Sequence, residues 1–273
     1  MRSERKLCFW MLTGVAVVAL TLSATPVRAD WNPGDPALWV QLPDLNPTGI
    51  DIDSDGCSIL ADDFACSFTG KITDFHIWGS WLNDVNGGVA SIRLQFYSND
   101  MSGPFSKPGD LLWTNTVGPA GAPGFDGVFT ERLYQTMPAG QTEAFWKPNS
   151  DPVPTGTDTQ IWQYNLTIDP NAAFFQQGSP TNPITYWVEV LVVPINSATD
   201  FGWKTRDPND GHYADDAVFF DTVSSPPGWA ELKYPVGHPL FGESVDMAFV
   251  ITPEPMSWLM LATGAMLCLR RRD

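Results

Sequence analysis

Basic residues are scarce in this sequence. It contains 15 Lys and Arg against 31 Asp and Glu over 273 residues, a formal net charge of −16. Seven of the basic but only three of the acidic residues lie outside residues 30–251, so this body has eight basic and 28 acidic side chains, a charge of −20. A field of that sign repels nucleic acid and anionic lipid and attracts divalent cations. It excludes nucleic acid as a partner.

Cysteine is also rare, with four residues in the chain. Cys8 and Cys268 lie in the terminal segments, which leaves Cys57 and Cys66 for the body. An oxidising compartment favours a disulfide between these two. If residues 59–64 form an extended strand, however, the cysteines lie roughly 30 Å apart, whereas a disulfide needs Cα atoms within about 7 Å. A bridge over a folded-back segment and two free thiols are therefore both open.

Sequence motifs of catalytic sites are missing as well. The three histidines do not stand at the spacing of metal ligands, and the chain has no HExxH, GxSxG, paired CxxC or Walker motif. A pair of carboxylates for glycoside hydrolysis leaves no such spacing in a sequence. We therefore expect a body that is not an enzyme, with a secreted hydrolase as an alternative.

Helical patterns are absent from the body, and strand patterns recur. Residues 160–168 and 71–82 alternate between apolar and polar side chains, while residues 185–193 are almost continuously apolar, as in a strand covered on both faces. About ten short segments of this kind, separated by Pro-rich and Gly-rich connections, predict an all-β fold. We expect a single β-sandwich domain, jelly-roll-like, over residues 30–251. Its first part, residues 30–57, should form an arm over the core.

The N-terminal 29 residues predict a signal peptide. A basic stretch with Arg5 and Lys6 precedes an apolar run over residues 7–22, and Ala29 follows in a setting that signal peptidase recognises. Cleavage there would start the exported chain at Asp30.

A second apolar run, residues 256–269, lies at the C-terminal end and holds fourteen uncharged residues. As a helix it would be roughly 21 Å long, against a bilayer core of about 30 Å. This predicts a marginal transmembrane helix, and the basic residues after it favour the cytoplasmic side. The flanking residues are Pro253, Glu254 and Pro255 before the run and Arg270, Arg271 and Arg272 after it.

This order of elements over residues 252–273 resembles the PEP-CTERM sorting tail of bacterial exported proteins. The resemblance implies recognition by exosortase, a membrane protease-transferase, and a destination in the cell envelope or extracellular matrix after initial anchoring in the inner membrane. The body resembles an uncharacterised bacterial extracellular domain that is often followed by such a tail and brings no catalytic residues. The segments that carry this second resemblance are residues 59–64, 77–81, 201–204 and 246–251.

Four aspartates are the candidate metal ligands. Asp51, Asp53 and Asp55 alternate before Gly56, as in the first half of a calcium loop, and Asp62 stands at the twelfth position. Aspartate is shorter than the glutamate usual there, and no helix is expected on either side, so the pattern does not predict an EF-hand. An acidic solvated turn is the leading interpretation, and a solitary calcium loop is the alternative.

The polar face of residues 71–82 is the candidate ligand-binding surface. The alternation places Phe75 towards the core and Asp74, His76 and Trp78 on the opposite face. An exposed indole beside polar groups can stack on a sugar ring, which suggests a carbohydrate-binding module for extracellular polysaccharide, stabilised by calcium. A second layer that covers this face is the other interpretation. A structural envelope protein remains the leading hypothesis.

Overall fold

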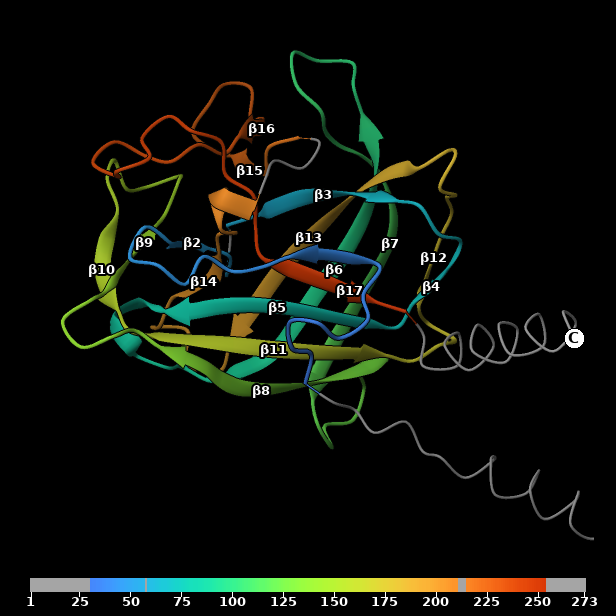
Figure 1. Ribbon diagram of the computed structural model, residues 1–273, viewed down its shortest axis with the longest axis horizontal. Helices are drawn as coiled ribbons and strands as arrows, with labels where there is room; N and C mark the ends of the chain where they lie inside the picture. Colours follow the sequence, from blue (N-terminus) through green and yellow to red (C-terminus); the bar gives the residue numbers. More distant parts are fainter. Residues whose placement is uncertain (1–29, 57, 211–214, 254–273) are drawn as a thin grey trace, which may run out of the picture. The chain divides into compact units, whose positions relative to one another are not determined.

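The computed structural model describes residues 30–56, 58–210 and 215–253 (Figure 1). The chain divides into two compact units, residues Met1–Asp30 and Trp31–Asp273. Apart from Asp30, the described residues belong to the second. The predicted signal peptide and the predicted sorting tail from Glu254 onward lie outside the described residues. Among the helices that are described, none has the length and apolar character needed to cross a bilayer.

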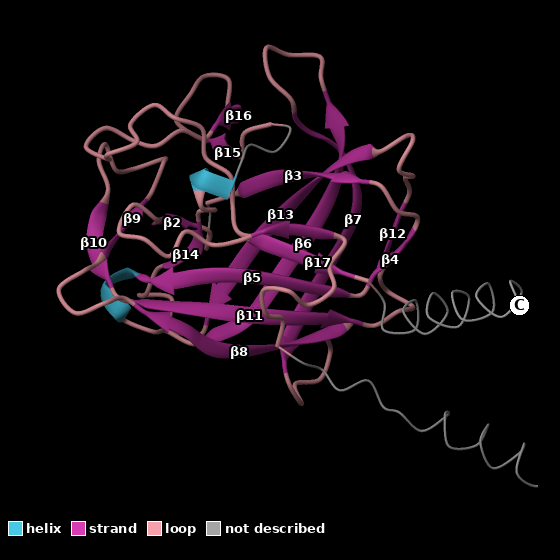
Figure 2. Cartoon of the chain, viewed as in Figure 1, coloured by secondary structure: helices cyan, strands magenta, loops and turns pink. Residues whose placement is uncertain are grey.

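Strands and loops make up almost all of the described chain (Figure 2). This confirms the predicted all-β class. Two short 3-10 turns, η1 (Leu82–Asp84) and η2 (Pro208–Asp210), are the helical elements of the described ranges. The strands in chain order are β1 Trp39–Gln41, β2 Ile50–Asp53, β3 Leu60–Cys66, β4 Gly70–Ile72, β5 Asp74–Trp81, β6 Val89–Asp100, β7 Lys107–Pro119, β8 Gly127–Thr136, β9 Glu143–Trp146, β10 Thr155–Asp158, β11 Gln160–Ile168, β12 Phe174–Gln176, β13 Ile184–Pro194, β14 Phe201–Lys204, β15 Val218–Asp221, β16 Gly228–Glu231 and β17 Phe249–Thr252.

One hydrogen-bonded path joins most of the strands. Its first part runs β10-β9-β2-β14-β5-β11-β8 and its second part β7-β6-β13-β3-β15-β16. The two parts meet where β7 runs parallel to β8 at Gly118 and Pro119. β17 pairs with β5 and with β1, and β12 pairs with β4 in a separate two-stranded sheet.

The main apolar core lies between the two parts of this path. Phe64 of β3 packs against Phe249 of β17, with ring centroids 6.3 Å apart. Phe96 of β6 packs against Phe75 of β5 at 6.4 Å. Each pair joins a strand from one part to a strand that belongs to or pairs with the other. The two parts therefore face each other across the core, which is consistent with a β-sandwich.

The strongest strand patterns of the sequence reappear as strands. The alternating segment 160–168 is β11, with the same bounds, and the apolar segment 185–193 lies within β13. β13 pairs with β3 and with β6 and is buried over most of its length, as its composition predicts. The segment 71–82 divides at Thr73 into β4 and β5.

The N-terminal arm covers the face of β5 that points away from the main core. Side chains of the arm, Trp31, Val40 and Leu42 among them, pack with Trp78 of β5 and Val250 of β17 in a second apolar cluster. All residues of β5 after Asp74 are consequently buried. An arm over the core was predicted for residues 30–57; the structure shows one over residues 31–45, whereas residues 50–53 form strand β2 of the main sheet.

Cys66 ends β3 as a buried free thiol. Its Sγ donates a hydrogen bond to the carbonyl oxygen of Phe68 at 2.7 Å, and burial raises the pKa of the thiol. The state of Cys66 agrees with the second of the two alternatives, in which the thiols are free. Cys57 lies outside the described residues.

Candidate functional site

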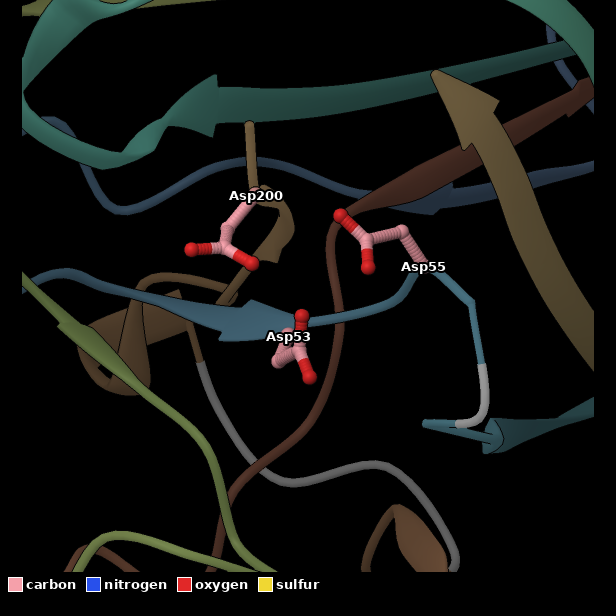
Figure 3. Close-up of side chains that lie close together, drawn as sticks. All are labelled: Asp53, Asp55 and Asp200. Carbon is pink, nitrogen blue, oxygen red and sulfur yellow. The ribbon is translucent and has the colours of Figure 1, made fainter. Parts of the chain in front are cut away.

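Two paired strands, β2 and β14, bring three aspartates together. The strands are antiparallel, with Asp53 opposite Gly202. Continuing this register by two residues places Asp55 opposite Asp200, just before β14 begins. Carboxylate oxygens of the three aspartates lie within 4.8 Å of one another (Figure 3). The register of one strand pair thus assembles a group from positions that are far apart in the sequence.

The three carboxylates differ in how they are held. The side chain of Asp53 is 6% exposed; its Oδ2 accepts a hydrogen bond from Ser58 Oγ, while its Oδ1 is buried without a hydrogen-bond partner. Oδ2 of Asp55 accepts a hydrogen bond of 2.6 Å from the backbone N–H of Phe201. A buried carboxylate oxygen without a donor is costly. The Oδ1 of Asp53 therefore lacks the donor or cation that would offset the cost of its burial.

A single basic side chain reaches the group in the described structure. β9 runs parallel to β2 with Ile52 opposite Trp146. The next residues along the two strands are Asp53 and Lys147. The Nζ of Lys147 lies 2.6 Å from Oδ1 of Asp200, and the Lys147 side chain is 28% exposed. The group of three carboxylates (Asp53, Asp55 and Asp200), hereafter the aspartate site, thus has one positive charge beside three potential negative charges.

Burial disfavours ionisation of Asp53 and Asp55. Burial, helped by the charges of Asp55 and Asp200, raises the pKa of Asp53 to about 7 against the opposing effects of Ser58 and Lys147. The pKa of Asp55 is also raised, mainly by burial. A divalent cation among these carboxylates would reverse the balance, because an opposite charge favours the ionised form.

The dimensions of the aspartate site suit calcium. Calcium binds six to eight oxygen atoms at about 2.3–2.6 Å, so oxygens on opposite sides of the ion lie about 4.6–5.2 Å apart. The mutual distances of the three carboxylate oxygens, at most 4.8 Å, fall within such a shell. Three carboxylates leave further positions of the shell for backbone carbonyl groups or water.

Two of the four predicted calcium ligands belong to this site and two do not. Asp53 and Asp55 do. Asp51 is fully buried, and its Oδ2 lies 3.6 Å from Nζ of Lys204. Residues two apart on a strand lie about 7 Å apart. Asp51 therefore points to the same side as Asp53 but lies two residues before it on β2, where the nearby charge is that of Lys204.

Asp62 lies in a different strand and has other partners. It belongs to β3, where its Oδ2 accepts hydrogen bonds from Gln41 Nε2 at 2.8 Å and from the backbone N–H of Met247 at 2.7 Å. Its side chain is 1% exposed. The loop that the sequence predicted as one calcium-binding unit therefore divides, because residues 60–66 form a strand of the opposite layer.

The predicted exposure of Trp78 is wrong. The residue is 0% exposed. Its ring makes edge-to-face contacts with Trp31, at 6.0 Å between centroids, and with Tyr134, at 5.6 Å. The arm supplies Trp31, so the covering layer comes from a segment 47 positions earlier in the chain. Trp78 is a core residue and offers no surface to a sugar ring.

The two other residues of the predicted ligand-binding surface are also bound within the protein. His76 is 1% exposed; its Nδ1 lies 2.7 Å from Asn165 Oδ1 and its Nε2 3.3 Å from Asp74 Oδ2. The same Oδ2 of Asp74 accepts a hydrogen bond from Thr252 Oγ1 at 2.7 Å. Asp74 and His76 thus link β5 to its neighbours β11 and β17.

Sequence reasoning missed Asp200 and Lys147. Asp200 directly precedes the segment 201–204 and Lys147 directly follows an aromatic pair at the end of β9, but neither belongs to a recognised motif. The signal that unites them with Asp53 is the pairing order β9-β2-β14. Pairing order and register are tertiary facts that spacing along the chain does not reveal.

Comparison with known proteins places the body in a family. No curated protein matches the chain, and no solved structure does. A family described as a domain of unknown function (DUF7901) matches residues 37–252, which include every strand described above. This agrees with the predicted resemblance of the body to an uncharacterised domain. The chain therefore belongs to the family of the domain of unknown function DUF7901.

Proposed function

We propose that this protein is an exported bacterial protein of the cell envelope or extracellular matrix, whose jelly-roll-like β-sandwich has a structural, non-enzymatic role and binds calcium at the aspartate site. The observation that carries the calcium assignment is the convergence of Asp53, Asp55 and Asp200, with the buried Oδ1 of Asp53 unpartnered. The acidic composition of the body supports it, because a strongly negative field concentrates divalent cations.

The role of the ion follows from where its ligands lie. Asp53 and Asp200 are 147 positions apart in the sequence, and a shared ion would join them directly. An ion that binds the folded chain and not the unfolded chain stabilises the fold by ligand linkage. The ion would also remove the repulsion among the carboxylates. Calcium in this role stabilises the domain and takes no part in a reaction.

Calcium is expected to raise the melting temperature of the purified protein. With free calcium at 100 times Kd, ligand linkage contributes about 2.7 kcal/mol. For a domain of this size that is a rise of roughly 5–10 °C. The measurement is a thermal unfolding series in calcium, magnesium and EDTA at constant ionic strength.

The matched variants for this measurement are Asp200→Asn and Asp110→Asn. Asp200→Asn removes one ligand of the aspartate site and should abolish the calcium shift. Asp110 is an exposed aspartate in β7, so Asp110→Asn removes the same charge away from the site and should keep the shift. An unchanged melting temperature of the wild-type protein in millimolar calcium would contradict the assignment, as would an equal shift in Asp200→Asn.

Export and sorting are tested by the mass of the mature protein. The order of Pro253, Glu254 and Pro255, the apolar run and the terminal arginines supports processing by exosortase, and the N-terminal pattern supports cleavage by signal peptidase. In a host with active exosortase we expect a chain that starts at Asp30 and has lost the apolar run. Intact-mass and peptide analysis of the secreted and membrane fractions measures both ends. A chain that still ends at Asp273 in such a host argues against sorting.

A further inference from the structure

The aspartate site contains its own counter-ion. Lys147 Nζ lies 2.6 Å from Oδ1 of Asp200, the closest Lys–carboxylate distance among the described ion pairs apart from the equal distance of Lys204 to Glu143. The ammonium group of Lys147 therefore lies beside the three carboxylates and supplies a positive charge to them.

The position of Lys147 is fixed by the fold. It continues β9 beyond Trp146, in register with Asp53 of β2. Its carbonyl oxygen accepts hydrogen bonds from the backbone N–H groups of Ser150, at 3.1 Å, and Asp151, at 2.9 Å, in a turn that holds the backbone in place. The backbone that carries the Lys147 side chain is therefore held beside the aspartate site.

A tethered cation and a bound metal ion oppose each other at the same carboxylates. A calcium ion at the aspartate site would have to take Asp200 from Lys147 or bind with an ammonium group a few ångströms away. Each arrangement weakens binding, since the affinity of calcium sites rises with the net negative charge of their ligands. At the same time, Lys147 lowers the repulsion among the carboxylates when no metal is bound.

We propose that Lys147 sets the calcium affinity of the aspartate site by competing with the metal ion for Asp200. The inference rests on the calcium site proposed above and adds to it the residue that tunes it. It places the wild-type site in the weak range typical of extracellular calcium modules, with Kd of about 10⁻⁴–10⁻³ M. Such a site fills where calcium is millimolar and empties where it is scarce, and Lys147 keeps the empty site folded.

The test is calcium titration by isothermal calorimetry at constant ionic strength, with three variants beside the wild type. Lys147→Met removes the charge and keeps the length of the side chain, and should lower Kd about tenfold or more. Lys147→Arg keeps the charge and should keep the wild-type Kd. Lys107→Met is the matched control, because Lys107 pairs with Asp100 at 3.7 Å and is as exposed as Lys147, 28%. It should leave Kd unchanged.

Each outcome bears on one of the two proposals. A tighter Kd in Lys147→Met alone supports the inference. Binding with the same Kd in the wild type and Lys147→Met overturns it and leaves the calcium site standing. A similar gain in Lys107→Met also overturns it, since the effect would then come from net charge. Absence of binding in both the wild type and Lys147→Met refutes the calcium site itself. Lys147→Gln replaces Lys147→Met if that variant does not fold.

Discussion

Replacing Trp78 with alanine is expected to lower the free energy of unfolding by about 3–5 kcal/mol, the usual cost of removing a large buried aromatic side chain. The indole is 0% exposed and lies between the sheet and the N-terminal arm, where Trp31 and Tyr134 contact it. Truncation would leave a cavity and also loosen the arm. Chemical denaturation followed by circular dichroism measures the change.

Two matched variants decide whether Trp78 is a core residue. Trp81 lies three positions along the same strand, is 1% exposed and faces the main core, so Trp81→Ala should destabilise by a similar amount. Phe175 is 53% exposed, and Phe175→Ala should change the free energy of unfolding by less than about 1 kcal/mol. If Trp78→Ala instead behaves like Phe175→Ala, the arm does not cover β5 and the surface is open to ligands after all.

Replacing Lys204 with methionine is expected to destabilise the protein by about 3–5 kcal/mol, because it leaves buried carboxylates without their counter-ion. Lys204 is 0% exposed; its Nζ lies 2.6 Å from Glu143 Oε2 and 3.6 Å from Asp51 Oδ2. The pair joins β14 to β9 and β2. Against a total stability that is typically about 5–15 kcal/mol, the loss is large.

The loss caused by Lys204→Met should be smaller at pH 5 than at pH 8. Burial raises the pKa of Glu143 from 4.5 to about 8, in spite of Lys204. A carboxyl group whose pKa is higher in the folded protein stabilises the fold in its protonated form, and this contribution is lost as the pH rises towards the folded-state pKa. At pH 5 Glu143 is neutral and needs no counter-ion. At pH 8 Glu143 in the Lys204→Met variant either ionises in an apolar setting without a counter-ion or stays protonated, and either state lowers the free energy of unfolding relative to the wild type.

The controls for Lys204 use a surface lysine and a double variant. Lys233 pairs with Glu231 at 3.6 Å and is 49% exposed, so Lys233→Met should cost less than about 1 kcal/mol. Combining Lys204→Met with Glu143→Gln removes both charges and should recover part of the stability. A loss in Lys204→Met that is independent of pH and unaffected by Glu143→Gln would contradict the role of the buried pair.

The positions of β5, β11 and β13 and the side-chain faces of β5 could be predicted from the sequence, whereas β8 and β9 were missed. The layer that covers β5 could not be predicted. The alternation in residues 71–82 correctly separates Phe75, Ile77 and Trp81 from Trp78. Alternation indicates which side chains share a face, but it does not indicate which segment of the chain covers that face. The arm was also predicted from its composition. Its position over Trp78 depends on the pairing of β1 with β17 and of β17 with β5, which no local pattern specifies.

Two of the three aspartates of the aspartate site could be predicted, for a similar reason. Asp53 and Asp55 belong to a local spacing that indicates a cation, so two of its members could be named. Spacing also suggested Asp51 and Asp62. Asp51 instead forms an ion pair with Lys204, and Asp62 accepts hydrogen bonds from Gln41 and Met247. The third aspartate of the site, Asp200, is brought close by the register between β2 and β14 and lies 147 residues away from Asp53 in the sequence.

The pairing of β17 has a mechanical consequence. This last described strand, Phe249–Thr252, lies between β1 and β5 and forms ladders with both, and Thr252 Oγ1 adds a bond to Asp74. A force applied to the chain beyond Thr252 and along the strand would load these bonds together, in shear. They would not open one after another, as they do when a strand is peeled from an edge. Such a force on the C-terminal end of the described domain would thus be resisted by two ladders at once.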